Sequence, residues 1–152
     1  GLLNRRGLQQ ALDALQVQCI PFAILALDID RFKSINDSHG HDVGDAAIVH
    51  IADQMRRYSR DSDILCRAGG EEFLLLLPGI STESARQAGE RLRQHIADHP
   101  FEPVGTITVS LGVAHFPSFH VDAEQALRLA DKALYMAKEQ GRNRVVVYPY
   151  AD

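Results

Sequence analysis

Acidic side chains stand next to two strand-like stretches of the chain, where they could bind a divalent metal ion. Asp28 ends the apolar run 22–27, and Glu71 follows the glycine pair Gly69 and Gly70. Carboxylates from two separate strands are common ligands of Mg²⁺ ions that assist attack on a phosphate. The glycines leave bare backbone beside Glu71, so a bulky charged ligand can approach closely. The pattern therefore predicts a site for a metal-bound polyphosphate.

A further acid, Asp30, lies two residues after Asp28. Residues i and i+2 of a strand share a face, so both carboxylates would point at one site if the strand continued. We expect one of the two to be a metal ligand. The alternative, that both are polar residues at a strand end, stays open.

Three basic residues could hold the remaining negative charge of such a ligand. Lys33 lies just after the acidic strand end, and Lys138 and Arg142 lie at the end of the last predicted helix. Basic residues in a last helical turn also favour the helix dipole, so Lys138 and Arg142 do not indicate a phosphate site by themselves. The chain contains neither G-x-x-x-x-G-K-[ST] nor G-x-G-x-x-G, which argues against a P-loop or dinucleotide-binding loop.

Length and composition are those of one globular domain. The chain has 152 residues, of which 45% are hydrophobic and 24% charged, so it can bury a hydrophobic core. Its formal net charge of -4 argues against a non-specific nucleic-acid binder, which needs a basic surface. The longest apolar runs have the length of a strand and not the roughly 20 residues that span a bilayer. We therefore expect no membrane contact by this segment.

The two cysteines and the first residues bear on the context of the chain. Cys19 and Cys66 each lie beside apolar residues and are expected to be buried, reduced thiols, which fits a cytoplasmic protein. Residues from Gly1 onward are typical of the entry to a helix. We therefore expect one domain over 1–152, cut from a longer protein whose N-terminal regulatory region, with any membrane tether, lies outside this segment.

Apolar spacing predicts the elements that position these side chains. Helices are predicted over about 5–17, 45–58, 81–96 and 122–140. Strands are predicted over 22–27, 106–116 and 144–148, and a β-hairpin over 64–77. The polar stretch 31–45 is expected to be a loop that carries chemistry. The predicted fold is α/β (α+β), with a mixed central sheet of about five strands covered by helices.

Several motifs at consistent spacing resemble the GGDEF family of bacterial diguanylate cyclases. They are Gly69-Gly70-Glu71-Glu72-Phe73, Asp28-Ile29-Asp30, Phe32-Lys33, Asn36-Asp37, Gly40-His41, Gly44-Asp45 and the run from Ala130 to Asn143. The resemblance covers essentially the whole chain, with Glu in the third position of the signature. It implies the fold of nucleotidyl cyclases and polymerase palms, which agrees with carboxylates at strand ends.

The resemblance also implies a metal site and a catalytic acid. It implies that Asp28, Glu71 and the backbone carbonyl of Ile29 hold Mg²⁺, with Mn²⁺ as a substitute. Glu71 would also help to deprotonate the attacking 3′-hydroxyl, and Lys33 would offset charge in the transition state. The implied reaction joins two GTP molecules into cyclic di-GMP and releases two pyrophosphates. Each domain would hold one GTP, so the enzyme would act as a homodimer.

Substrate contacts follow from the same resemblance. Asn36 and Asp45 would read guanine, whose adjacent N–H donors a carboxylate can accept. The remaining implied contacts are Phe32 and His41 beside the nucleotide, Gly69 and Gly70 in the turn, and Lys33, Lys138 and Arg142 on the triphosphate.

The segment Arg60-Asp61-Ser62-Asp63 fits the R-x-x-D pattern of family members that are inhibited by their product. Arg91 falls where the resemblance implies a second arginine on that ligand. Arg60 could offer a bidentate fork to guanine or phosphate. We therefore expect product inhibition by cyclic di-GMP at Arg60, Asp63 and Arg91, although a short R-x-x-D can also mark a solvated turn.

Two other functions stay open at this point. A catalytically silent GGDEF module would keep the fold and bind cyclic di-GMP or GTP as a sensor. A nucleotidyl cyclase for ATP is disfavoured by Asn36 and Asp45. An enzyme is favoured over the silent module by the presence of all six residues that it would need, which are Asp28, Lys33, Asn36, Asp45, Glu71 and Glu72.

Overall fold

Five strands form one mixed sheet in the computed structural model, which describes residues 2–117 and 121–149. The strands are β1 (Phe22–Ile29), β2 (Ile64–Gly69), β3 (Glu72–Pro78), β4 (Val109–Phe116) and β5 (Val145–Val147). Their order is β2-β3-β1-β4-β5, with β4 and β5 parallel and the other neighbours antiparallel. The predicted mixed sheet is thus confirmed.

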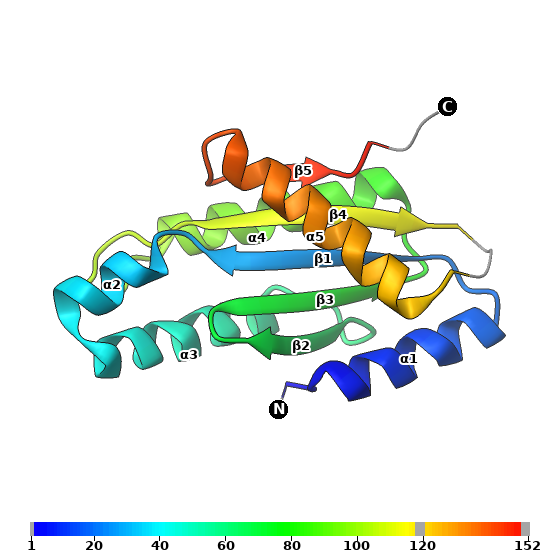
Figure 1. Cartoon of the computed structure of the whole chain (residues 1–152), viewed down its shortest axis with the longest axis horizontal. Helices are drawn as coiled ribbons and strands as arrows, with labels where there is room; N and C mark the ends of the chain where they lie inside the picture. The colour runs from blue at the N-terminus through cyan, green and yellow to red at the C-terminus, as the bar shows by residue number, and fades with distance from the viewer. Residues whose placement is uncertain (1, 118–120, 150–152) are drawn as a thin grey trace.

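Helices cover both faces of this sheet (Figure 1). They are α1 (Arg5–Val17), α2 (Phe32–His39), α3 (His41–Arg57), α4 (Thr82–Asp98) and α5 (Ala123–Glu139). Every residue of β1 is buried, as expected for a central strand with two covered faces. Its side chains alternate between two cores, so Ile24 and Ala26 pack with α1 and α5, and Leu25 and Leu27 pack with α3 and α4.

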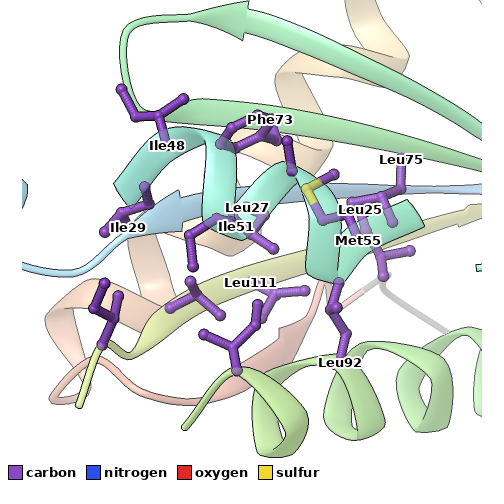
Figure 2. Packing of buried hydrophobic residues seen from close by; sticks show 14 of the residues in the cluster. Leu25, Leu27, Ile29, Ile48, Ile51, Met55, Phe73, Leu75, Leu92 and Leu111 are labelled. Atoms are coloured by element: carbon purple, nitrogen blue, oxygen red, sulfur yellow. The ribbon is translucent and has the colours of Figure 1, made fainter. Parts of the chain in front are cut away.

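The core under α3 and α4 fixes the sheet against these helices. Figure 2 shows Ile51 and Met55 of α3 close to Leu25 and Leu27 of β1, with Leu92 of α4 beside them. Ile51 and Met55 are completely buried. Burial of one such side chain contributes roughly 1.5–3 kcal/mol, so this contact holds α3 firmly beneath the sheet.

The stretch predicted as a loop, 31–45, is instead helical. It contains all of α2 and the start of α3, which meet at Gly40 with φ of 88°. The prediction failed because α2 is short and polar, and only Phe32 and Ile35 provide apolar spacing. Lys33 and its neighbours are therefore presented from helices and not from a loop.

The turn of the hairpin is not the predicted glycine pair Gly69 and Gly70. β2 continues to Gly69 with an irregularity between Arg67 and Gly69, so the turn consists of Gly70 and Glu71. Gly70 has φ of 46°, a conformation that favours glycine. The guanidinium of Arg67 donates to the carbonyl of Gly70 at 3.0 and 2.9 Å from Nε and Nη2. Glu71 consequently lies in the turn itself.

Other local predictions have mixed outcomes. The helix predicted over 81–96 is confirmed as α4, and Ser81 is its N-cap, since Ser81 Oγ accepts a hydrogen bond from the backbone N–H of Ser84 at 3.1 Å. Cys66 is buried, as predicted, but Cys19 is exposed, so the prediction for Cys19 was wrong. Cys19 lies in the turn after α1 with φ of 55° and is left outside the core. Among the described residues, no helix is both long and apolar enough to cross a membrane.

Candidate functional site

The two predicted acidic segments lie side by side at one end of the sheet, where β1 finishes and β3 begins. We call this end, which contains Asp28, Glu71 and Glu72, the acidic edge. In the register of β1 with β3, Asp28 is paired with Glu72, and the backbone N–H of Ile29 donates to the carbonyl of Glu71 at 3.4 Å. The end of β1, the hairpin turn and the C-terminal end of α5 all lie toward the same side of the molecule in Figure 1. The carboxylates predicted as metal ligands therefore come from adjacent backbone segments.

Asp28 has one paired and one unpaired carboxylate oxygen. Its Oδ2 forms an ion pair with Nζ of Lys138, which reaches it from the last turn of α5. Its Oδ1 is buried and has no hydrogen-bond partner among the described residues. Burial raises the pKa of Asp28, Lys138 opposes that effect, and the nearby charge of Glu71 adds to it. A carboxylate in this state is well suited to bind a cation.

Asp30 has a different role in the structure. Its Oδ1 accepts from Ser110 Oγ at 2.6 Å, and its Oδ2 accepts from Thr108 Oγ1 at 2.8 Å and the backbone N–H of Asn143 at 3.0 Å. Both oxygens are thus already hydrogen-bonded within the protein. Of the two acids between which the sequence left a choice, Asp28 is the one with an oxygen left for a metal.

Glu72 of β3 faces a second acid, Asp131, which lies in the middle of α5. Burial, together with the negative charges of Asp131 and Asp28, raises the pKa of Glu72 to about 7. Glu72 Oε1 and Asp131 Oδ1 are buried, and neither has a hydrogen-bond partner within residues 2–117 and 121–149. Because two carboxylates cannot donate to each other, this contact favours a proton on one of them.

The sequence predicted no role for Asp131, although its spacing contains a signal. Asp131 and Lys138 are seven residues apart on α5, which places them on the same face of that helix. An acid and a base two turns apart beside the buried Ala130 and Ala137 could have indicated a polar contact with the sheet. Which residue they would meet depends on how α5 lies across the sheet.

The predicted guanine-reading residues converge between α2 and α3. A Cβ atom at Gly44 would lie 1.8 Å from Asn36 Oδ1 and 3.3 Å from Phe32 Cζ, so the glycine makes room for both side chains. Asn36 Oδ1 is buried and has no partner among the described residues. Asp45, next to Gly44, is exposed, as is His41 in the first turn of α3. Asn36 and Asp45 thus come from the neighbouring helices α2 and α3.

The predicted phosphate-binding residues surround the same edge of the sheet. Lys138 contacts Asp28, while Lys33 at the start of α2 and Arg142 after α5 are exposed. A Cβ atom at Gly69 or Gly70 would meet nothing within 4 Å, so the turn borders open space. The structure therefore brings Lys138 into direct contact with Asp28 and leaves Lys33 and Arg142 exposed.

The side chains alone do not form a complete metal-binding cluster. Within the described part of the chain, no group of three or more His, Cys, Asp or Glu side chains is arranged to hold a metal ion. The predicted ligand set has two carboxylates, Asp28 and Glu71, together with the backbone carbonyl of Ile29. A nucleotide phosphate would have to supply further oxygen ligands, as is usual for Mg²⁺.

The residues of the predicted inhibitory site line a separate cavity of about 290 Å³. Arg60 and Asp63 come from the turn before β2, and Arg91 comes from α4. Arg60 Nε donates to Asp63 Oδ1 at 2.9 Å, and Arg60 Nη2 donates to the carbonyl of Pro78 at 3.0 Å. Since Pro78 and Glu72 are at opposite ends of β3, the cavity lies away from the acidic edge.

Comparison with known proteins agrees with these observations. The family profile described as "Diguanylate cyclase, GGDEF domain" matches residues 1–144. The probable diguanylate cyclase DgcT of Escherichia coli is 40% identical over 135 residues, which cover 86% of this chain and 30% of DgcT. The chain spans less than half of the length of the curated relatives it matches, between 30% and 43% for three of them.

Solved structures show the same fold. The active GGEEF domain of a diguanylate cyclase from Vibrio cholerae matches with a TM-score of 0.90 and 35% identity, covering 99% of this chain and 100% of that one. The GGDEF domain of DgcB from Caulobacter crescentus, in complex with c-di-GMP, matches with a TM-score of 0.89 and 30% identity over 97% of this chain and 91% of that one. The predicted cyclase and palm-like fold class is thereby confirmed.

Proposed function

The chain belongs to the GGDEF domain family of diguanylate cyclases, and we propose that it condenses two GTP molecules into cyclic di-GMP and two pyrophosphates. The observation that carries this proposal is the Asp28 carboxylate, which lies beside the Glu71 turn with one buried, unpartnered oxygen. The same activity is named for several relatives, including DgcM of Escherichia coli. The catalytic unit would be one GGDEF-type domain over 1–152.

The metal site would consist of Asp28, Glu71 and the backbone carbonyl of Ile29. These are hard oxygen donors, which suit Mg²⁺ and also Mn²⁺. The bound ion would polarise a phosphate and favour ionisation of the attacking hydroxyl. Lys138, now paired with Asp28, would exchange that partner for phosphate oxygens of the substrate.

Guanine would bind between α2 and α3. Guanine presents N1–H and N2–H donors side by side, and the exposed Asp45 carboxylate can accept from both. The buried, unpartnered Asn36 Oδ1 supports a further contact with the base. Phe32 and His41 would border the nucleotide, and the bare backbone of Gly69 and Gly70 would let it approach the turn.

The triphosphate would be held by the basic residues at the same edge, which are Lys33, Lys138 and Arg142. The 3′-oxygen of one GTP attacks the α-phosphorus of the other and forms a phosphodiester bond. The bond from that phosphorus to the oxygen bridging the β-phosphate breaks, and pyrophosphate leaves with the electron pair. Glu71 accepts the proton of the 3′-hydroxyl, and Lys33 offsets charge on the phosphoryl oxygens.

A second round of the same step closes the ring and releases the second pyrophosphate. One domain offers one guanine site between Asn36 and Asp45, so two copies must face each other with a GTP in each. The active species would therefore be a homodimer. Regions outside this chain would regulate how often two domains meet.

The cavity at Arg60, Asp63 and Arg91 would bind the product and inhibit the enzyme. Arg60 is held by Asp63 and carries a guanidinium that is partly exposed, with 47% of its side chain accessible. A guanidinium can pair with phosphate or with the edge of guanine in a bidentate manner. The solved complex of DgcB with c-di-GMP supports binding of this ligand within the family.

The test is incubation of the purified chain with Mg²⁺ and GTP, and separately with ATP, at high protein concentration. We expect cyclic di-GMP and pyrophosphate from GTP and no cyclic dinucleotide from ATP, and we expect Glu71→Ala to abolish turnover. Glu83→Ala is the matched control, because Glu83 is an exposed acid of α4 paired with Arg86. A chain that binds GTP or cyclic di-GMP without turnover would be a silent binding module, and an active Glu71→Ala variant would refute the assigned base.

A further inference from the structure

The turn that follows α5 has an unfavourable backbone conformation. Gly141, Arg142 and Asn143 have φ values of 124°, 64° and 47°, so three successive residues lie in the left-handed region. This region is unfavourable for side chains other than glycine, and only Asn tolerates it moderately well. Strain of this kind persists only where surrounding contacts impose it, and it concentrates at functional sites. We call these three residues the 141–143 turn.

Contacts from two other elements hold Asn143 in place. Arg93 Nη1 of α4 donates to Asn143 Oδ1 at 2.8 Å, and the backbone N–H of Asn143 donates to Asp30 Oδ2 at 3.0 Å. Asp30 is buried and is itself held by Thr108 and Ser110. The 141–143 turn is thus tied to α4 on one side and to the end of β1 on the other.

The Arg93 side chain is held in place for its contact with Asn143. Its guanidinium also forms an ion pair with Glu90, one turn earlier on α4, and only 14% of its side chain is exposed. A planar guanidinium fixed by a carboxylate has little freedom left, so its remaining donors point in set directions. Its hydrogen bond to Asn143 spans 50 residues of sequence. The hydrogen bond therefore joins α4 to a distant segment of the chain, unlike an ion pair within one helix.

The same helix contains a matched pair that lacks this contact. Arg86 binds Glu83 with the same three-residue spacing, but 43% of its side chain is exposed. Among the described residues, the hydrogen bonds of the Arg86 guanidinium all go to Glu83. Arg86 therefore lies on the same helix as Arg93, has the same charge and also pairs with a glutamate three residues earlier, but it does not reach the 141–143 turn.

We infer that Arg93 is a positioning residue for phosphate binding, which holds Arg142 toward the triphosphate through the side chain of Asn143. The inference rests on the proposed function, in which Arg142 contacts the triphosphate. Arg93 itself is not proposed as a phosphate ligand, because its guanidinium already binds Glu90 and Asn143. Loss of Arg93 should release the turn and let Arg142 leave its strained conformation.

The consequence should depend on how many phosphates the ligand has. Arg93→Ala should weaken binding of a non-hydrolysable GTP analogue about tenfold, the effect of losing one charge-assisted hydrogen bond. Binding of GMP, which lacks the outer phosphates, should change about twofold or less. In turnover, the KM for GTP should rise by a similar factor while kcat falls much less, because the acids at the end of β1 are untouched.

The experiment is calorimetric binding of GMP, GDP and the GTP analogue with Mg²⁺ to wild type, Arg93→Ala, Arg93→Lys, Asn143→Ala and Arg86→Ala. For the three variants at positions 93 and 143, we expect the loss of affinity to increase from GMP to GDP to the GTP analogue. We expect Arg86→Ala to bind all three ligands as wild type does. Lysine keeps the charge but cannot bind Glu90 and Asn143 together, so it serves if Arg93→Ala does not fold. In an Arg142→Ala background, Arg93→Ala should add less than twofold.

Two results would overturn the inference. If wild type makes cyclic di-GMP but Arg93→Ala and Arg93→Lys lose no more GTP affinity than Arg86→Ala, Arg93 does not position the turn. An equal loss for GMP and the GTP analogue also overturns it, because it would show a general structural effect. If wild type itself neither turns over GTP nor binds it more tightly than GMP, the proposed function fails and the inference fails with it.

Discussion

Replacing Gly44 by alanine tests the guanine site without removing any polar group. A Cβ atom at this position would lie 1.8 Å from Asn36 Oδ1 and 3.0 Å from Asn36 Cγ. Such a contact is impossible, so the Asn36 side chain must rotate away from its buried position. Asn36 is the side chain with an unpartnered buried oxygen between α2 and α3, and its displacement should remove it from the nucleotide.

Gly44→Ala should change stability less than it changes GTP binding. Gly44 lies within α3 with ordinary helical backbone, where alanine is favoured over glycine by about 0.8–1.0 kcal/mol. The clash is with the end of a flexible side chain, and a χ angle forced about 30° from a staggered rotamer costs about 0.5–1.5 kcal/mol. The net change in the free energy of unfolding should therefore be within about 1 kcal/mol. The affinity for GTP should fall about tenfold, the effect of one lost hydrogen bond to a ligand.

A double mutant separates this explanation from a general packing effect. In an Asn36→Ala background the clash is absent, so Gly44→Ala should leave GTP binding unchanged within twofold. In the same background, Gly44→Ala should raise the free energy of unfolding. The gain should be slightly reduced by the 3.3 Å contact between the new Cβ atom and Phe32 Cζ. GTP binding would be measured by calorimetry and unfolding by urea titration followed by circular dichroism. An equal loss of GTP affinity in both backgrounds, or no loss in either, would refute the reasoning.

Three further predictions follow from the acids, the cavity and the proposed dimer. The raised pKa of Glu72, about 7 against 4.5 in an unfolded chain, means that the folded protein holds a proton that the unfolded chain has released. Stability without Mg²⁺ should therefore fall as pH rises between these values, and Glu72→Gln should flatten that slope in urea titrations; a wild-type slope of the opposite sign would contradict it. Arg60→Ala should raise the cyclic di-GMP concentration for half inhibition about tenfold or more, with GTP turnover at low product unchanged, and unaltered inhibition would remove that site. Turnover per chain should fall on dilution, because the proposed dimer dissociates, and a constant rate would contradict two-domain catalysis.

Central features of the fold were predictable because they depend on local pattern. The unbroken apolar run of β1 indicates a strand with both faces covered, and β1 is buried at every position. A glycine pair between apolar runs indicates a hairpin, whose turn then lies at the edge where β1 ends. The proximity of Asp28 and Glu71 follows from these two elements, so it could be predicted from the sequence.

The features that were missed depend on contacts between distant segments. The helix α2 is too short and polar to show a clear period, and it is stabilised by burial of Ile35 in the core. The three hydrogen bonds of Asp30 join residues that are 78 to 113 positions apart in sequence. The contact of Glu72 with Asp131 depends on where α5 crosses the sheet. No local pattern contains that information.

These distant contacts give the acidic edge its electrostatic character. Burial raises the pKa values of both Asp28 and Glu72. The negative charges of Glu71 and Asp30 add to the effect at Asp28, and those of Asp131 and Asp28 add to it at Glu72. Lys138 opposes the effect at Asp28 through a direct contact, and Arg5 opposes it at Glu72 as the weakest of the influences there. The acids therefore outnumber the cations close to them, and protonation of Glu72 relieves only part of the repulsion. A divalent cation that prefers oxygen ligands relieves this repulsion more fully than a single basic side chain does. The acidic edge therefore suits a metal-bound triphosphate better than it suits a simple salt bridge.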